Sequence, residues 1–141
     1  MAFASMLEAH NHLRQQAGVA ALGWSSANAS EAQRWADQLA TEDCRLRFNP
    51  DSARRSQYRD NLFQAYSSKP YQGWLRSADQ VVARWDEGRR YYNSATASCS
   101  QSGGGCNLYA QIVAAGTREV GCARARCEAA EVWVCTYSPP R

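Results

Sequence analysis

The chain has 141 residues, of which 16 are basic and 13 acidic, and a formal net charge of +3. This length suits one domain, over residues 1–141, that is large enough to bury a core of its own. No apolar run approaches the roughly 18–20 residues of a membrane-spanning helix, so we do not expect a transmembrane protein. The charge is modest and no basic and aromatic recognition motif accompanies it, which argues against nucleic acid as a partner.

The six cysteines favour a disulfide framework over a metal centre. Their number is even, and the CxxC spacing that a zinc ribbon needs does not occur. Structural disulfides persist in oxidising compartments, so the cysteines predict a secreted or periplasmic protein, while the pairing stays open. Asn28 begins an N-glycosylation sequon near a predicted helix start. Its exposure is open from the sequence, and we interpret the match as a chance occurrence.

Two helices are predicted at the start of the chain. Residues 5–16 place apolar side chains three and four residues apart, and Gly18 follows where a helix commonly ends. Ser25 and Ser26 are candidate N-caps for a second helix that runs to about residue 40 with an apolar stripe on one face.

Residues 41–76 form the least regular part of the chain and are rich in arginine, serine and aromatic residues. A connection this long inside a compact domain is usually functional or mobile. Within it, residues 58–63 are a candidate short strand. The aromatic side chains either pin the connection to the core or line an apolar groove for a lipid or sterol; they are Tyr58, Phe63, Tyr66, Tyr71 and Trp74.

The second half of the chain predicts one more helix and then strands. Ser77 and Gln80 form a capping box for a helix over about 78–91. A turn rich in glycine and serine follows at 98–105. Three strands are then predicted, over 107–115, 118–124 and 131–137. Helices first and antiparallel strands last indicate an α+β fold.

Seven short motifs occur along the chain in the order typical of one protein family. They are Ala9–Arg14 with Gly18-Val19 and Leu22–Trp24, Ala32–Ala36, Asp60–Leu62, Trp85 with Tyr92-Asn93, Cys106–Val113, Val120–Ala123 and Val134–Pro140. On these motifs the chain resembles the CAP superfamily, which comprises cysteine-rich secretory proteins, antigen 5 and plant pathogenesis-related 1 proteins. Each motif is weak by itself, and their shared order carries the resemblance.

The resemblance implies a three-layer α-β-α sandwich around a central antiparallel sheet. It also implies the disulfide pairing of the plant members, which in this chain is Cys44–Cys127, Cys99–Cys106 and Cys122–Cys135. In the chain-entropy model, the bridge that closes the longest of these loops contributes roughly 4–5 kcal/mol. A secreted, extracellular domain is the corresponding expectation for localisation.

The resemblance also implies a cleft, which in many CAP proteins presents two histidines and two acids and in some binds zinc or another divalent ion. At the two histidine positions this chain has Phe48 and Leu108. The first acid is Asp60, and the second falls on Gly88, although Glu87 stands next to it. Apolar side chains therefore replace both imidazoles, which favours an apolar ligand over an ion.

The two histidines of the chain do not compensate for this loss. His10 and His12 are two residues apart and so lie on different faces of a helix. We expect His10 to pack and hydrogen-bond under the sheet and His12 to be exposed. Because the cysteines are used in disulfides, too few zinc ligands are left, and we predict no metal and no other cofactor. No Gly-x-Ser-x-Gly elbow occurs, and no catalytic residue is assigned.

The leading functional hypothesis is a secreted, non-enzymatic binding module for a lipid, a sterol or a protein partner. Its candidate ligand-binding residues are Phe48, Asp60, Asn61, Glu87, Leu108, Tyr109 and Gln111. A lipid head group or other anionic surface would meet an arginine cluster made of Arg45, Arg47, Arg54, Arg55 and Arg59. One alternative is a hydrolase or divalent-cation site that uses Asp60 and Glu87. Another is a purely structural extracellular domain.

Overall fold

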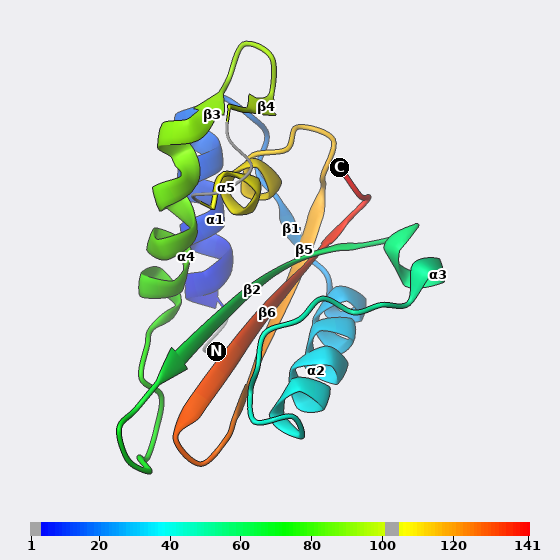
Figure 1. Cartoon of the computed structure of the whole chain (residues 1–141). Helices are drawn as coiled ribbons and strands as arrows, with labels where there is room; N and C mark the ends of the chain where they lie inside the picture. Colours follow the sequence, from blue (N-terminus) through cyan, green and yellow to red (C-terminus); the bar gives the residue numbers. More distant parts are fainter. Residues whose placement is uncertain (1–3, 101–104) are drawn as a thin grey trace.

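The computed structural model describes residues 4–100 and 105–141, which fold into three layers (Figure 1). The middle layer is a four-stranded sheet. One of its faces is covered by α2 (Ser26–Ala40), and the other by α1 (Ala4–Ala17), α4 (Ala78–Asp86) and the short α5 (Cys106–Ile112). This arrangement confirms the predicted α+β class and the sandwich of helices around a central sheet.

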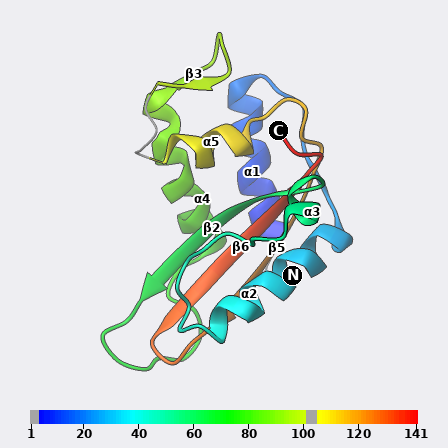
Figure 2. The same ribbon diagram turned by 45° about the vertical axis from the view of Figure 1, so that its right-hand side comes forward.

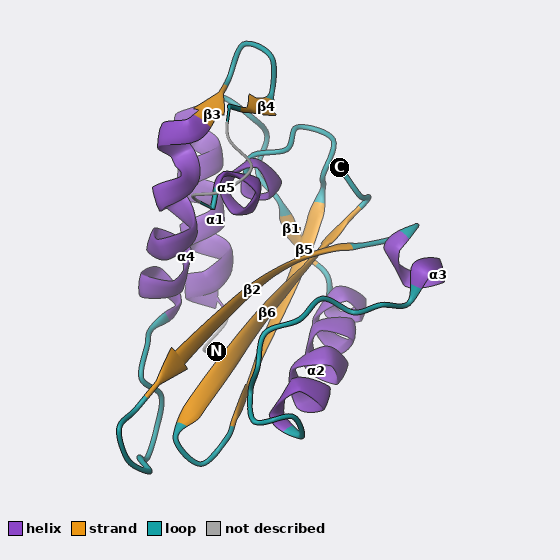
Figure 3. Cartoon of the chain, in the orientation of Figure 1, coloured by secondary structure: helices purple, strands orange, loops and turns teal. Residues whose placement is uncertain are grey.

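The sheet has the strand order β1-β5-β6-β2, so that β1 and β2 form its two edges. Its strands are β1 (Gly23–Trp24), β2 (Arg59–Tyr66), β5 (Glu119–Arg126) and β6 (Ala130–Ser138). The strand β6 pairs antiparallel with β2 and with β5, whereas β1 runs parallel to β5. The sheet is therefore mostly, not entirely, antiparallel (Figure 3). The predicted strand at 58–63 is confirmed and is longer than expected.

The central strand β6 separates two hydrophobic cores, because successive side chains of a strand point to opposite faces. Val132 and Val134 pack with Leu39 of α2. On the other face, Trp133 and Tyr137 belong to the core under α1 and α4. All four of these β6 side chains are almost completely buried. The strand predicted over 131–137 is confirmed.

The helix boundaries follow from their caps. The hydroxyl of Ser25 accepts a hydrogen bond from the backbone N–H of Asn28, which starts α2. Ser77 and Gln80 form the predicted capping box of α4. The chain leaves α4 through the 3₁₀ turn η1 (Glu87–Tyr91), within the predicted helix, and then forms a small ribbon of β3 (Tyr92–Asn93) and β4 (Ser98–Cys99). A short helix, α3 (Ser52–Arg55), interrupts the connection between α2 and β2 and was not predicted.

The predicted strand at 107–115 is wrong, because this segment forms α5. Its apolar residues alternate, but Tyr109, Ile112 and Val113 also recur at helical spacing, and these three side chains are buried together in one core. Gly105 caps the helix with a positive φ of 74°, a conformation that favours glycine. A short apolar run fits either periodicity, and here the tertiary packing selects the helix.

The connection after β2 is anchored by a buried carboxylate. Glu131 of β6 is fully buried, and its Oε1 atom accepts hydrogen bonds from the Tyr71 hydroxyl at 3.0 Å and from the backbone N–H of Leu75 at 2.6 Å. Beside it, the guanidinium of Arg124 stacks on the ring of Trp74 at 3.9 Å. Tyr71 and Trp74 thus pin the connection to the sheet, as one of the two interpretations of these aromatics predicted.

The disulfides of the structure are Cys44–Cys127, Cys99–Cys106 and Cys122–Cys135, the same pairs that the resemblance implies. Asn28 is buried, and its side-chain amide donates to the backbone carbonyl of Thr136 and to the hydroxyl of Ser138. An amide held this way is not accessible to a glycosyltransferase in the folded chain. Among the described residues, no helix has the length and apolarity required to cross a membrane.

Candidate functional site

The cleft lies where the start of β2, α5 and the segment before α3 meet. Its volume is about 260 Å³. It is lined by Phe48, Asn49, Arg54, Arg55, Tyr58, Arg59, Asp60, Asn61, Asn107, Leu108, Gln111 and Arg141. Five of the seven predicted ligand-binding residues therefore line one cleft. The other two, Glu87 and Tyr109, do not.

Phe48 and Leu108 give the cleft its apolar surface. Phe48 is 54% exposed, which is unusual for a phenylalanine, and Leu108 of α5 is half-buried. They occupy the two positions at which the resemblance expects imidazoles. A ligand that covers both side chains is stabilised by the apolar area that it removes from water, and this contribution does not require a metal ion.

Asp60 is held in an ion pair. The Arg54 Nη1 atom donates to Asp60 Oδ2 at 2.6 Å and Nη2 donates to Oδ1 at 3.2 Å, while the Thr136 hydroxyl donates to Oδ1 at 2.7 Å. The Arg54 and Asp60 side chains are only 8% and 5% exposed. Burial lowers the pKa of Arg54, but its hydrogen bonds to Asp60 and Glu31 outweigh this effect and raise the pKa above its usual value. Asp60 is therefore not a free base or a free ligand.

Arg54 is therefore buried and is not available to bind an anionic surface. The arginines of the predicted cluster fall into separate groups. Arg47 lies over the Trp35 ring and donates twice to Glu42, away from the cleft. Arg55 is exposed and Arg59 is half-buried, and both line the cleft. Sequence reasoning missed the ion pair of Arg54 because nothing in the local pattern distinguishes it from its neighbours.

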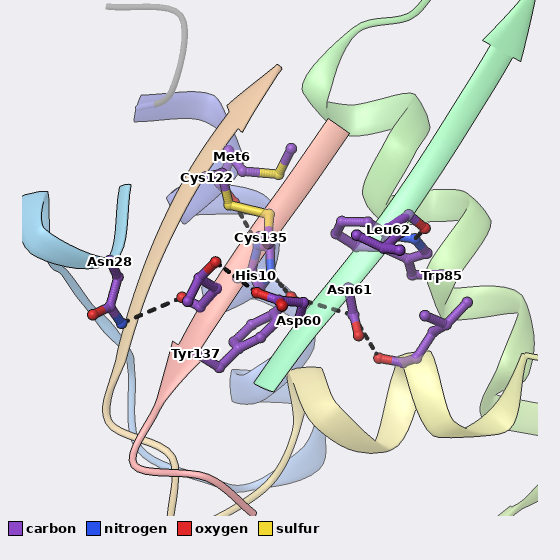
Figure 4. The surroundings of a disulfide bond; sticks show 12 residues. Met6, His10, Asn28, Asp60, Asn61, Leu62, Trp85, Cys122, Cys135 and Tyr137 are labelled. Carbon is purple, nitrogen blue, oxygen red and sulfur yellow. Dashed lines mark hydrogen bonds between the residues drawn. A yellow bond between two sulfur atoms is a disulfide. The ribbon is translucent and has the colours of Figure 1, made fainter. Parts of the chain in front are cut away.

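A chain of hydrogen bonds connects the floor of the cleft with α1 (Figure 4). The Asn61 amide donates to the backbone carbonyl of Leu108 at 2.9 Å and to the Tyr137 hydroxyl at 3.2 Å. His10 Nδ1 lies 2.8 Å from the Met6 carbonyl and therefore carries the proton. His10 Nε2 then accepts from the Tyr137 hydroxyl at 2.7 Å. Asn61 thus positions α5, and His10 packs under the sheet as predicted.

Burial sets the protonation states of this chain. Burial, opposed by the hydrogen bond to the Met6 carbonyl and aided by the nearby charge of Arg14, lowers the pKa of His10 from 6.5 to about 4. Burial also raises the pKa of Tyr137 well above its usual value. Both rings are therefore neutral at pH 7, and their role is structural.

Tyr109 and Gln111 have different surroundings although both belong to α5. The Tyr109 ring is buried and meets Tyr92 edge-on at a centroid distance of 5.3 Å, so it is a core residue. Gln111 lines the cleft, but its amide is buried and donates to the Thr117 hydroxyl at 3.2 Å. Neither side chain offers the cleft a free polar group of the kind that catalysis would use.

Glu87 lies outside the cleft. Its side chain is 59% exposed and is 3.5 Å from Arg84 of α4. Leu108 lines both the cleft and the neighbouring groove to which Glu87 belongs, so it lies between Asp60 and Glu87. The structure does not bring the two acids together in one opening.

The position at which the resemblance expects the second acid is occupied by Gly88, and the backbone there leaves no room for a side chain. A Cβ atom at this position would lie 2.2 Å from the backbone oxygen of Gly105, so no side chain fits. Within residues 4–100 and 105–141, no three His, Cys, Asp or Glu side chains are grouped so as to hold a metal ion. The donor set of the cleft does not fit zinc.

A second opening, the α1–α4 opening, lies between those two helices and has a volume of about 360 Å³. It combines apolar side chains with three acids and is lined by Glu8, Ala9, His12, Leu13, Asp79, Val82, Ala83 and Asp86. Sequence reasoning did not identify it, since its residues look like ordinary surface and core positions of two helices. Its carboxylates disfavour an anionic ligand.

A family model described as "Cysteine-rich secretory protein family" (CAP) matches residues 7–137. The chain is 35% identical to pathogenesis-related protein 1B of Nicotiana tabacum over 135 residues, which cover 95% of this chain and 73% of that protein. It is 32% identical to pathogenesis-related protein 1 of Arabidopsis thaliana, with coverages of 95% and 74%.

Solved structures show the same fold. Schistosoma mansoni venom allergen-like protein 4 matches with a TM-score of 0.72 and 20% identity, covering 97% of this chain and 87% of that chain. The protein MpPR-1i matches with a TM-score of 0.63 and 26% identity, with coverages of 96% and 88%. A structure described as NaASP2 with Zn²⁺ has a TM-score of 0.70 at 17% identity and coverages of 99% and 80%.

Proposed function

Because this chain belongs to the cysteine-rich secretory protein (CAP) family, we propose that it is an extracellular, non-enzymatic binding domain. Its ligand is an amphipathic lipid or sterol whose apolar part lies in the cleft. One observation carries the proposal: Phe48 and Leu108 present apolar surface on the cleft, while Asp60 is held by Arg54. Membership of a family of secretory proteins supports an extracellular location.

The apolar surface favours such a ligand energetically. Fully burying a phenylalanine or leucine side chain stabilises a complex by about 1.5–3 kcal/mol. Phe48 is more than half exposed and Leu108 is half-buried, so covering both contributes a few kcal/mol. A hydrated metal ion would instead lose solvation against these side chains.

The charges at the rim favour an acidic head group. Arg55 and Arg59 line the cleft, and no ion pair involves either of them within the described part of the chain. Among the described residues that line the cleft, Asp60 is the only acidic side chain, and Arg54 neutralises it. A carboxylate or sulfate at the rim therefore meets cations, whereas in the α1–α4 opening it would meet three acids.

Binding of a fluorescent fatty acid and of a sterol sulfate, measured by titration, tests the proposal. The double substitution Phe48→Ser with Leu108→Ser removes about 3 kcal/mol of apolar contact and is expected to weaken binding about a hundredfold. The control Ala9→Leu narrows the α1–α4 opening and leaves the affinity unchanged. If Ala9→Leu abolishes binding and the double substitution does not, the ligand lies between α1 and α4 and the assignment to the cleft is wrong.

The alternatives make different predictions in the same assays. A divalent-cation site or hydrolase that uses Asp60 and Glu87 requires tight zinc or calcium binding by calorimetry, or an activity that Glu87→Gln abolishes. A purely structural extracellular domain predicts that neither lipid probe binds. Either result contradicts the proposed binding function.

A further inference from the structure

The edge strand β2 forms the floor of a groove that the cleft does not include. This β2 groove has a volume of about 750 Å³ and is lined by Leu46, Leu62, Phe63, Gln64, Ala65, Tyr66, Arg76, Gln80, Ala83, Arg84, Trp85, Glu87 and Leu108. The strand is the outermost of the sheet, with α4 on one side and the connection between α2 and α3 on the other (Figures 1 and 2). The β2 groove is thus a sheet edge between two walls.

The backbone of β2 presents hydrogen-bonding groups to the groove. The Leu62 carbonyl accepts a hydrogen bond from the Trp85 indole at 3.0 Å, so it points away from β6. Residues two apart in a strand point their backbone groups to the same side, which places the N–H and C=O groups of Gln64 and Tyr66 on the groove side. The backbone N–H of Ser67 donates to Ala129 at the other side, in agreement with this alternation.

The backbone groups of Gln64 and Tyr66 on this side have no partner among the described residues. Natural edge strands are usually protected by charged side chains, by proline, by a bulge or by a cover. The segment 62–66, Leu-Phe-Gln-Ala-Tyr, has neither charge nor proline, and it pairs with β6 in unbroken register. The β2 groove therefore keeps a regular pairing edge open.

We propose that the β2 groove binds an extended peptide segment of another protein, which adds to the sheet as a strand beside β2. The backbone groups of Gln64 and Tyr66 pair with the peptide, in the manner of strand addition to an exposed sheet edge. This inference is independent of the proposed lipid function, although Leu108 lines both openings.

The walls of the groove determine what kind of occupant fits. A second copy of the chain cannot present its own β2, because that strand lies between the same two walls. A single extended segment fits between them. Half-exposed Phe63 and exposed Leu46 and Tyr66 favour apolar side chains at alternate positions of the peptide.

The charges of the wall favour an acidic residue in the peptide. Arg76 and Arg84 are exposed on the α4 side of the groove. The 3.5 Å contact between Arg84 and Glu87 joins side chains that are 67% and 59% exposed, so it competes weakly with a new partner. A peptide carboxylate at this wall can form ion pairs with Arg76 and Arg84.

A display library of random linear peptides, selected on the whole chain, provides the probe. We expect recovered peptides with apolar residues at alternate positions and an acid, and Tyr66→Pro is the decisive variant. Proline removes the backbone donor that faces the groove and none of those that face β6, so the fold is kept. The matched control Tyr66→Ala removes the ring and keeps the donor.

Tyr66→Pro is expected to weaken binding of a recovered peptide at least about fivefold relative to Tyr66→Ala, as for one lost hydrogen bond. Hydrogen exchange at the Gln64 and Tyr66 amides is expected to slow when the peptide binds. Equal binding to both variants, unchanged exchange at these amides, or no recovered peptide overturns the inference. So does a dimer in sedimentation that Tyr66→Pro dissociates, because it assigns the edge to a second copy. Phe48→Ser leaves peptide binding unchanged, which separates this test from that of the cleft.

Discussion

Protonation of His10 is expected to link the stability of this domain to pH. The buried ring donates through Nδ1 to the Met6 carbonyl and accepts through Nε2 from the Tyr137 hydroxyl. A second proton on the ring would remove the acceptor that the hydroxyl uses and bury a charge near Arg14. The folded chain therefore resists protonation at this site.

The size and sign of the effect follow from the two pKa values. The His10 pKa is about 4 in the folded chain, against 6.5 for an ordinary histidine. Above pH 6.5 neither state binds the proton, so stability is unaffected. As the pH falls from 6.5 to about 4, only the unfolded state takes up the proton, and the free energy of unfolding decreases by about 3 kcal/mol.

Urea unfolding at a series of pH values measures this linkage. The variant His10→Gln loses the packing and hydrogen bonds of the ring, so its free energy of unfolding at pH 7 is lower. Because it has no ring to protonate, its free energy of unfolding decreases less between pH 6.5 and 4. The matched control His12→Gln changes an exposed ring on the same helix and should run parallel to the unaltered chain. If the curves of His10→Gln and the unaltered chain are parallel over this range, the reasoning is refuted.

Three further predictions concern other buried groups. Glu131→Gln is expected to weaken the anchor of the 67–77 connection and to lower the free energy of unfolding by about 2 kcal/mol. Burial, together with the Glu131 carboxylate, raises the pKa of Tyr71 to about 12, so an NMR titration of the variant should show a lower Tyr71 pKa. Gly121→Ala places a Cβ atom 2.1 Å from a backbone nitrogen of α2 and is expected to cost at least about 2 kcal/mol in thermal unfolding, whereas Gly116→Ala, with nothing within 4 Å, is neutral. Arg54→Met leaves a buried carboxylate without its cation and lowers the free energy of unfolding by about 3 kcal/mol; a loss below about 1 kcal/mol contradicts the assigned ion pair.

The sequence predicts the parts of the fold that depend on long, regular patterns. The apolar stripe of α2, the capping box at Ser77 and the two faces of β6 each follow from periodicity or local capping, and all are present. The segment at 107–115 is different, because its few apolar residues fit both a strand and a helix. Only the packing of Tyr109 against Tyr92 and the turn at Gly105 decide between them.

The candidate site is predictable only in part, for a related reason. Motif order places Phe48, Asp60 and Leu108 near one another, and they line one cleft. Glu87 is next in sequence to the expected position but points into another opening, because η1 turns there. The ion pair of Asp60 depends on Arg54 in α3, a helix of four residues that has no clear sequence signal.

The contacts of the cleft separate its polar residues into those that support the fold and those that are available. The Asn61 amide donates a hydrogen bond to the Leu108 carbonyl, and the Gln111 amide donates one to the Thr117 hydroxyl. Asp60 is neutralised by Arg54. None of these side chains can change its partner without loosening α5 or β2. What is available at the cleft is apolar surface with arginines at its rim. Polar groups that are committed to holding α5 and β2 keep the shape of the cleft fixed, which suits the ligand-binding role proposed above.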